Sequence, residues 1–353
     1  MSLTIDKLAT PSVLIDIDRV RANLRRAQDY ADTHGLRLRP HIKTHKVPAL
    51  ARLQVELGAC GITCQKLSEA EVMADAGLSD IFISYNIVGA DKLSRLTALA
   101  RRITLSVAAD SAYTVSGYID AARAADVTLT VLVECDTGAG RCGVATADAA
   151  LDLARRLEGA SHARFGGLMT YPKAGGTEQT AAWIAGALDL FARAGMAVPV
   201  VSSGGTPDMW RAHLVPGVTE YRPGTYIYMD RSQVAAGAAT LDECALTVQA
   251  TVVSRPSETR AVLDAGTKTL TSDLLGLDGF GHVLSCPSAR VDALSEEHGV
   301  IQADAEVLPA LGERVRIVPN HACVVSNMFD RVYFVSGDTV LDAVPVAARG
   351  CVT

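Results

Sequence analysis

Short apolar runs alternate with Ala- and Leu-rich amphipathic stretches over the first two-thirds of the chain. This alternation is typical of βα units and a parallel sheet. Nine such runs occur, one more than a (β/α)8 barrel needs. If the first run, Ser12–Ile17, is left out, eight strands begin near Arg37, Gly61, Asp80, Ile103, Val127, Phe165, Val198 and Thr219. The pattern therefore predicts an α/β protein with a TIM barrel.

The pattern changes after about residue 240, where apolar runs alternate with turn residues and no helical stretch lies between them. Such runs are typical of antiparallel strands. A chain of 353 residues is also long enough for two domains. We expect a barrel over 18–238 and a mostly antiparallel β domain made of 239–353 with 1–17.

The charge balance excludes several classes of protein. Lys and Arg number 33 against 39 Asp and Glu, and no basic block provides the patch that a nucleic-acid binder needs. No run of 18 apolar residues predicts a membrane span. The first residues lack a signal-peptide pattern, so we expect a cytoplasmic protein whose eight cysteines are reduced.

Catalytic groups of a parallel barrel lie at the C-terminal ends of its strands. Lys43 holds such a position in the segment R-P-H-I-K-T-H-K, among other cationic and imidazole side chains. Cationic neighbours favour a neutral, nucleophilic amine, although a surface lysine on a basic turn is the simpler interpretation. The other predicted strand ends carry Gln65, Tyr85, Asp110, Asp136 with Arg141, Tyr171, Ser203–Gly205 and Gly224–Tyr226.

Two glycine-containing turns, 202–206 and 222–225, follow the last two predicted barrel strands. Barrels commonly bind phosphate there through backbone N–H groups and hydroxyls, although ordinary βα turns have similar compositions. A lysine at one strand end, together with phosphate-type turns at the last two, suggests pyridoxal 5′-phosphate.

Several segments resemble one enzyme family, in the same order and over nearly the whole chain. They are R-P-H-I-K-T-H-K, V-L-V-E-C-D-T-G-A-G-R-C-G-V, T-E-Y-R-P-G-T-Y, L-S-E-E-H-G and V-P-N-H-A-C. The family is that of D-threonine aldolase and D-serine dehydratase, within the fold-type III, alanine-racemase-like pyridoxal phosphate enzymes. The resemblance implies a cofactor-binding barrel, a metal-binding β domain and a homodimer.

The resemblance also implies roles for individual residues. Lys43 is expected to form the internal aldimine, and Arg222 to face the pyridine nitrogen. Arg141 is expected near the cofactor hydroxyl or the substrate carboxylate, and Tyr171 near the ring. The residues expected at the phosphate are Ser203, Gly204, Gly224 and Thr225, with Tyr226 close by.

His321 and Cys323 form the candidate metal motif. On an extended strand, residues at i and i+2 project to the same face and can reach one ion. Taken alone, His-x-Cys is more often core packing. The resemblance implies that the metal binds at this motif. Aldolases of the family usually have His-x-Asp at this position, and a carboxylate suits manganese or magnesium. The thiolate of Cys323 favours zinc and the dehydratase branch. Val324-Val325, where dehydratases commonly have Pro-Thr, departs from that branch.

The acidic segment Ser295–Gly299 has two interpretations, a solvated turn or a support near the metal or substrate. The function expected from the resemblance is a lyase that acts on D-3-hydroxy amino acids. Dehydration of D-serine or D-threonine to a 2-oxo acid and ammonia is the leading reaction, and aldol cleavage by a D-threonine aldolase is the alternative.

Two other functions are less favoured. A racemase needs a second base, normally a tyrosine of the C-terminal domain in a G-Y-G-type context, and none is found there. A non-catalytic pyridoxal phosphate carrier stops after the barrel, whereas this chain continues for about 110 residues and includes the His-x-Cys motif.

Overall fold

The computed structural model describes residues 3–353, which divide into two compact units. The β unit holds residues 3–26, 44–47 and 225–350, and the barrel unit holds 27–43, 48–224 and 351–353. The domain limits expected from sequence, 18–238 and 239–353 with 1–17, stay a prediction, because compactness does not show which part folds independently. Residues 1 and 2 lie outside the described part.

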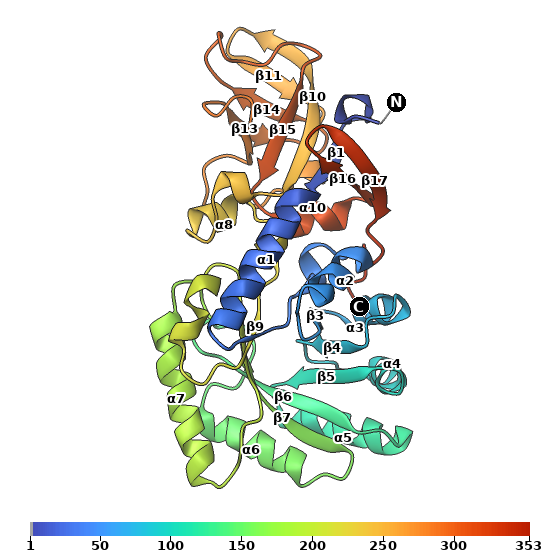
Figure 1. Cartoon of the computed structure of the whole chain (residues 1–353), viewed down its shortest axis with the longest axis vertical. Coiled ribbons are helices and arrows are strands. Elements are labelled where there is room, and N and C mark those ends of the chain that lie inside the picture. The colour runs from blue at the N-terminus through green and yellow to red at the C-terminus, as the bar shows by residue number, and fades with distance from the viewer. Residues whose placement is uncertain (1–2) are drawn as a thin grey trace. The chain divides into compact units, whose positions relative to one another are not determined.

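Eight parallel strands form the sheet of the barrel unit, which confirms the predicted barrel. Their order is β2-β9-β8-β7-β6-β5-β4-β3, and a parallel bridge between His41 and Thr63 joins the segment after β2 to β3. Figure 1 shows the strands from β3 to β7 side by side. They are β2 (Arg37–Leu38), β3 (Ile62–Cys64), β4 (Asp80–Ile83), β5 (Thr104–Ala109), β6 (Leu129–Cys135), β7 (Ala163–Thr170), β8 (Val201–Gly204) and β9 (Glu220–Arg222).

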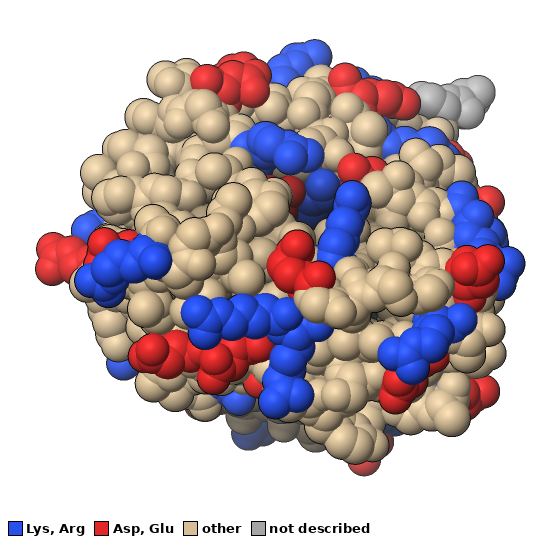
Figure 2. Space-filling view, turned by 90° about the horizontal axis from the view of Figure 1, so that it is seen from below, with Lys and Arg blue, Asp and Glu red and all other residues tan. Residues whose placement is uncertain are grey.

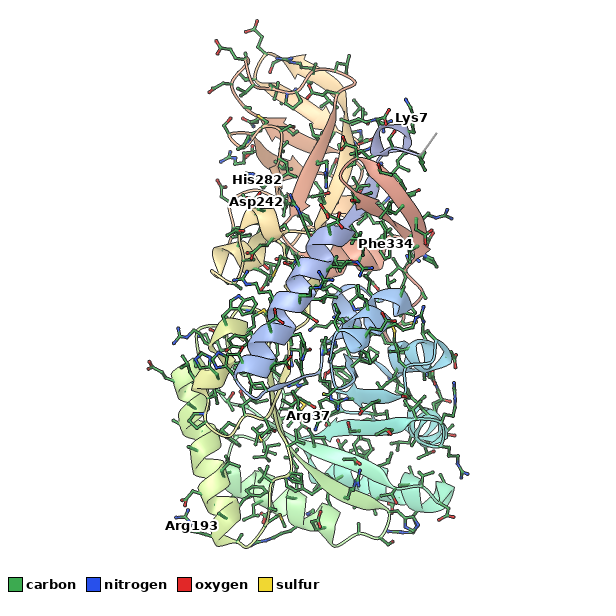
Figure 3. The ribbon with its side chains drawn as sticks, in the orientation of Figure 1. Lys7, Arg37, Arg193, Asp242, His282 and Phe334 are labelled. Carbon is green, nitrogen blue, oxygen red and sulfur yellow. The ribbon has the colours of Figure 1, made fainter. Side chains whose placement is uncertain are left out.

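Helices connect successive barrel strands, and α4 to α7 lie outside the sheet in Figure 1. Two of them begin at side-chain caps: the hydroxyl of Ser111 accepts from the Thr114 N–H, and that of Thr146 from the Ala149 N–H. Figure 3 labels Arg37 where β2 begins and Arg193 where α7 ends. The helices are α1 (Ile17–Thr33), α2 (Pro48–Glu56), α3 (Leu67–Asp75), α4 (Ala90–Ala100), α5 (Ala112–Ala125), α6 (Ala147–Glu158) and α7 (Thr177–Arg193).

A bulge in β7 depends on glycine. Val131 of β6 pairs with Phe165 of β7, whereas the next residue, Leu132, pairs with Gly167, so that Gly166 is the extra residue of the bulge. Gly167 has a φ of +129°, and a Cβ there would lie 2.0 Å from the Val200 carbonyl oxygen. No other residue fits this conformation and this approach between backbones, so the glycine pair places the C-terminal end of β7.

A buried ion-pair network holds β2, β8 and β9 together. Arg39 Nε donates to Glu220 Oε2 at 2.7 Å, and Arg39 Nη1 donates to Asp80 at 2.6 Å. The other oxygen of Glu220 accepts from the Ser202 hydroxyl at 2.7 Å. Because each buried charge has charged or hydroxyl partners, the network fixes the last strands on which the site residues lie.

The β unit contains one nine-stranded sheet in the order β11-β14-β13-β12-β15-β10-β1-β16-β17, with an additional pairing of β10 and β11 that closes six strands into a small barrel. All pairs are antiparallel except β1 with β16, which confirms the mostly antiparallel domain. The strands are β1 (Ser12–Asp16), β10 (Leu246–Ser257), β11 (Arg260–Leu263), β12 (Gly281–Val283), β13 (Arg290–Leu294), β14 (Gly299–Gln302), β15 (Arg314–Pro319), β16 (Arg331–Ser336) and β17 (Thr339–Pro345).

Three short helices in the β unit were not expected from the sequence. They are α8 (Arg231–Ala235), α9 (Thr267–Leu270) and α10 (Ala322–Met328). The segment of α10 is rich in β-branched residues and too short to show a helical period. It begins nevertheless because the buried Asp230 carboxylate accepts from the Ala322 N–H at 2.9 Å, a partner distant in sequence.

The eight cysteines are free thiols. Cys64 and Cys135 are buried, whereas Cys142 is exposed. Lys, Arg, Asp and Glu are intermixed on the face seen in Figure 2, which shows no continuous basic patch. Within residues 3–353, no helix has the length and apolarity needed to cross a membrane.

Candidate functional site

Lys43 lies in the short 3₁₀ helix η2 (Ile42–Thr44), which follows β2. Its backbone N–H donates to His41 Nδ1 at 3.3 Å. His41 Nε2 lies 3.0 Å from Gln65 Oε1, at the end of β3, and Gln65 Nε2 donates to the Ser84 carbonyl oxygen. Hydrogen bonds therefore connect the segments that follow β2, β3 and β4 in the neighbourhood of the lysine.

His41 is fully enclosed by the barrel. Burial, followed by the positive charge of Lys43, lowers the pKa of His41 well below 6.5. The imidazole is therefore neutral at physiological pH, so that one ring nitrogen accepts from the Lys43 backbone while the other donates to Gln65. This role of His41 was not predicted, although the histidine stood in the lysine motif.

Lys43, Arg141 and Tyr171 come together in the barrel unit. Lys43 Nζ lies 5.9 Å from the centroid of the Tyr171 ring, and the Arg141 guanidinium lies 4.4 Å from it. Tyr171 is the first residue after β7, and Arg141 lies in the loop after β6. Two cations that share one aromatic ring at the strand ends form a place for an anionic, planar ligand.

A carboxylate that the sequence analysis missed lies beside this group. Glu134, on β6, is 3 % exposed, and its Oε1 lies 3.9 Å from Arg141 Nη2. Ligand atoms of Glu134, Asp110 and Cys142 all lie within 4.8 Å of one another. The signal was present: a charged residue inside the apolar run V-L-V-E-C needs a partner when buried.

Glu134→Gln is expected to stabilise the cofactor-free protein at pH 7. Burial raises the pKa of Glu134 above its ordinary value of 4.5, despite the nearby Arg141. The folded state therefore holds the proton more tightly than the unfolded state, and the stability that this carboxyl contributes is lost as the pH rises through its folded pKa. The free energy of unfolding of the variant should exceed that of the wild type by more at pH 7 than at pH 4.5, as measured by urea unfolding.

The matched control is Asp136→Asn, two residues further along. Asp136 Oδ1 accepts from the N–H groups of Gly138 and Gly140, and these bonds lower the pKa of Asp136. This variant should lose stability at pH 7, in the opposite direction. A loss at pH 7 in the Glu134 variant as well would contradict the assignment of Glu134 as a costly buried carboxylate.

The two predicted phosphate turns belong to different units. Ser203 and Gly204 end β8 in the barrel unit, and Gly224 is the last residue of that segment. Thr225 and Tyr226 form the 3₁₀ helix η4 (Thr225–Ile227) of the β unit. The structure therefore shows the first turn with Lys43, Arg141 and Tyr171, and the second only as far as Gly224.

The first turn fits a phosphate. Ser203 is 2 % exposed, and its hydroxyl makes no hydrogen bond within the described residues. Gly205 has a φ of +115°, and a Cβ there would meet only Tyr171 Cε2 at 3.8 Å and a proline carbon at 3.9 Å. Open backbone at Gly205, beside the Tyr171 ring, and the unused Ser203 hydroxyl two residues earlier are what phosphate binding through N–H and O–H donors requires.

Arg222 is fully buried beneath this turn. Its Nε donates to the Ser202 hydroxyl at 2.8 Å and its Nη2 to the Thr170 carbonyl oxygen at 2.7 Å. Burial lowers the pKa of Arg222, but a guanidinium stays charged at neutral pH. Since no described group bonds its Nη1 atom, the side chain retains donors for the pyridine nitrogen of a cofactor.

The metal motif has a different backbone from the one predicted. The expected extended strand is wrong: β15 ends at Pro319, His321 is the N-cap of α10, and Cys323 lies in its first turn. The two side chains still meet, since His321 and Cys323 hydrogen-bond to each other. This hydrogen bond raises the pKa of His321 to about 9. An extended N-cap followed by a helical turn brings both groups to one side.

Three oxygen groups of the β unit contact this pair. Asp273 Oδ2 lies 2.7 Å from His321 Nδ1, and the hydroxyls of Thr44 and Thr225 lie 3.1 and 3.6 Å from Cys323 Sγ. An imidazole and a thiol in contact form a donor set that fits zinc. That His321 and Cys323 bind a metal stays a prediction.

The acidic segment is a hairpin turn between β13 and β14. Glu296 and Glu297 are exposed and both form ion pairs with Lys268, at 2.9 and 2.8 Å. The Ser295 carbonyl oxygen accepts from the Thr267 N–H. These contacts favour the solvated turn over a support for the metal.

Known proteins are similar to this chain over nearly its whole length. Residues 15–232 match the alanine racemase N-terminal domain, and residues 245–335 match a putative serine dehydratase domain. A D-threonine aldolase of Arthrobacter sp. is 36% identical, over 98% of this chain and 93% of its own length. The D-threo-3-hydroxyaspartate dehydratase of Delftia sp. is 32% identical, over 96% and 97%.

Solved structures give the same result. The D-threonine aldolase of Filomicrobium marinum superposes with a TM-score of 0.94 at 34% identity, covering 100% of this chain and 99% of that one. A D-threo-3-hydroxyaspartate dehydratase with a histidine replaced by alanine has a TM-score of 0.90 at 30% identity, covering 98% and 96%. A third structure, of the same dehydratase with a cysteine two positions later replaced by alanine, is described as metal-free. The chain therefore belongs to the fold-type III, alanine-racemase-like family of pyridoxal phosphate enzymes and, like its aldolase and dehydratase relatives, is a lyase.

Proposed function

We propose that this enzyme is a zinc-dependent dehydratase of D-3-hydroxy amino acids, such as D-serine and D-threonine. The observation that carries the proposal is the contact between His321 and Cys323, with the thiol 3.1 Å from the hydroxyl of Thr44. Thr44 directly follows Lys43 in the chain. The substrate class is supported by relatives that are named for aldolase or dehydratase reactions on D-3-hydroxy amino acids.

Each proposed site residue has a task in binding. Lys43 would hold pyridoxal phosphate covalently, with Tyr171 against its ring and Arg222 at its pyridine nitrogen. Arg141 would bind the cofactor hydroxyl or the substrate carboxylate, oriented by the buried Glu134. The phosphate would be held by Ser203, Gly204, Gly224 and Thr225, with Tyr226 close by.

The protein's part in the reaction is to move one proton and to hold the leaving group. When bound, pyridoxal phosphate supplies an electron sink for the substrate Cα, and zinc supplies a Lewis acid for the β-hydroxyl. Lys43 Nζ, free once substrate has displaced it, would take the proton from Cα. His321 and Cys323 would hold the zinc. Loss of water and hydrolysis of the released enamine then yield a 2-oxo acid and ammonia.

Aldol cleavage is the second candidate, favoured by the 36% identity to a D-threonine aldolase. In that reaction a base takes the proton of the β-hydroxyl, the Cα–Cβ bond breaks, and glycine and an aldehyde form. The Cys323 thiolate favours dehydration, because it suits zinc better than the manganese or magnesium of a carboxylate site. The resemblance further supports a homodimer, which is part of the proposal.

The test is product analysis with purified enzyme that carries pyridoxal phosphate and zinc. We expect pyruvate and ammonia from D-serine and 2-oxobutyrate and ammonia from D-threonine, with L-serine and L-threonine as inert controls. Glycine and acetaldehyde from D-threonine, with little keto acid, would make the enzyme an aldolase instead. Turnover of the L-isomers alone would refute the substrate class.

A further inference from the structure

The β unit contains a carboxylate that neither the family motifs nor the proposed mechanism uses. Asp273 lies in the loop 271–279, and its Oδ2 is 2.7 Å from Nδ1 of His321. The two side chains are 37% and 29% exposed, so water only partly screens the pair. A carboxylate at this distance keeps the proton on Nδ1, which leaves Nε2 as the nitrogen that can bind a metal.

Asp273 is not a third ligand in this geometry. Its Oδ2 contacts Nδ1 of His321, so it is aimed at the imidazole and leaves Nε2 as the other ring nitrogen. Within residues 3–353, ligand atoms of His321, Cys323 and Asp273 do not form a group in which all three lie within 4.8 Å. The carboxylate therefore acts through the imidazole.

The loop that carries Asp273 is tied to the residue before His321. Asn320 is fully buried, and its Nδ2 donates to the carbonyl oxygens of Asp273 at 3.1 Å and Gly279 at 2.9 Å, one near each end of the loop. Its Oδ1 accepts from Arg231 Nη1 at 2.7 Å. The same guanidinium donates to the Asp278 carbonyl oxygen at 2.9 Å.

This arrangement holds strained backbone. Thr271 and Leu275 have φ values of +66° and +52°, in the left-handed region that residues with a Cβ rarely adopt. The Thr271 hydroxyl accepts from the Asp273 N–H at 3.2 Å. Such strain persists only where surrounding contacts determine the conformation, and here those contacts place one carboxylate against one imidazole.

We propose that Asp273 is a positioning residue for the metal site: held by Asn320 and Arg231, it fixes the tautomer and orientation of His321 so that Nε2 binds zinc. The inference rests on the proposed function only in that His321 and Cys323 are taken as metal ligands.

The test measures zinc affinity rather than activity. Zinc dissociation constants of the pyridoxal phosphate-loaded enzyme are measured by competition with a chromogenic chelator, for wild type, Asp273→Ala, Asp273→Asn and His321→Ala. Loss of such a partner costs about 10- to 100-fold in metal affinity. We expect that loss in Asp273→Ala and a smaller one in Asp273→Asn, whose amide oxygen still accepts from Nδ1.

The matched control is Asp304→Ala, which removes an exposed carboxylate of the same unit and should leave the dissociation constant unchanged. Wild-type affinity in Asp273→Ala, with zinc binding lost in His321→Ala, would overturn the inference but keep the metal site. Wild-type affinity in His321→Ala would instead refute the metal site itself.

The visible spectrum of the cobalt-substituted enzyme separates positioning from ligation. Positioning predicts the same band intensities in wild type and Asp273→Asn once the site is saturated. Changed band intensities, together with equal affinity losses in Asp273→Ala and Asp273→Asn, would make Asp273 a ligand and overturn the inference.

Discussion

Lys43→Ala is expected to lose the covalent attachment of pyridoxal phosphate and about 10⁴-fold in turnover of the proposed substrate D-serine, because the variant lacks the amine proposed as the base at Cα. Lys43 Nζ is the amine that lies near both the Tyr171 ring and, through that ring, Arg141. The measurement is borohydride reduction of the holoenzyme, followed by mass spectrometry of the peptide that contains residue 43.

The control is Lys173→Ala, which removes an exposed lysine two residues after Tyr171. This variant should keep both the cofactor attachment and the activity. A Lys43→Ala protein that still gives a reduced cofactor adduct on another lysine, with near-normal turnover, would show that Lys43 is not the attachment site.

Removal of the metal is expected to lower activity about 10³-fold, because Lewis-acid stabilisation of the leaving hydroxyl contributes several kcal/mol. Treatment with a chelator should cause this loss of activity in the wild type, and zinc should restore the activity. Cys323→Ala should stay inactive after zinc is added, whereas Cys323→Asp should recover best with manganese, since a carboxylate is a harder ligand than a thiolate.

Cys286→Ala serves as the control for cysteine chemistry, because Cys286 is a buried free thiol in the same unit whose Sγ lies 4.0 Å from the Ser288 hydroxyl. It should respond to chelator and zinc as the wild type does. Full activity of Cys323→Ala in the presence of chelator would contradict a catalytic metal at this position.

The barrel was predictable because its signal is local and repeated. Each of its strands is a short apolar run next to an amphipathic helix, and the run Ser12–Ile17 could be set aside because it lacked a place among eight units; it forms β1 of the other sheet. The strand-end rule also selected Tyr171 and Arg141, which do meet.

The parts that were missed depend on contacts between distant segments. His321 and Cys323 were placed on a strand because nothing nearby in sequence predicts the cap that Asp230 provides 92 residues away. Asp273 pairs with a histidine 48 residues further on. Sequence patterns report periodicity, and these residues have none.

The position of β1 has a consequence for how the chain is made. β1 lies between β10, with which it pairs from Leu246, and β16, with which it pairs from Tyr333. During synthesis from the N-terminus, one edge of β1 stays unpaired until more than two hundred further residues have been made, and the other edge until more than three hundred have been made. Long-range pairing of this kind is slow, and an unpaired apolar strand is prone to aggregate. The ribosome therefore makes residues 27–224 before either pairing partner of β1, so the nine-stranded sheet can close only after that segment is complete.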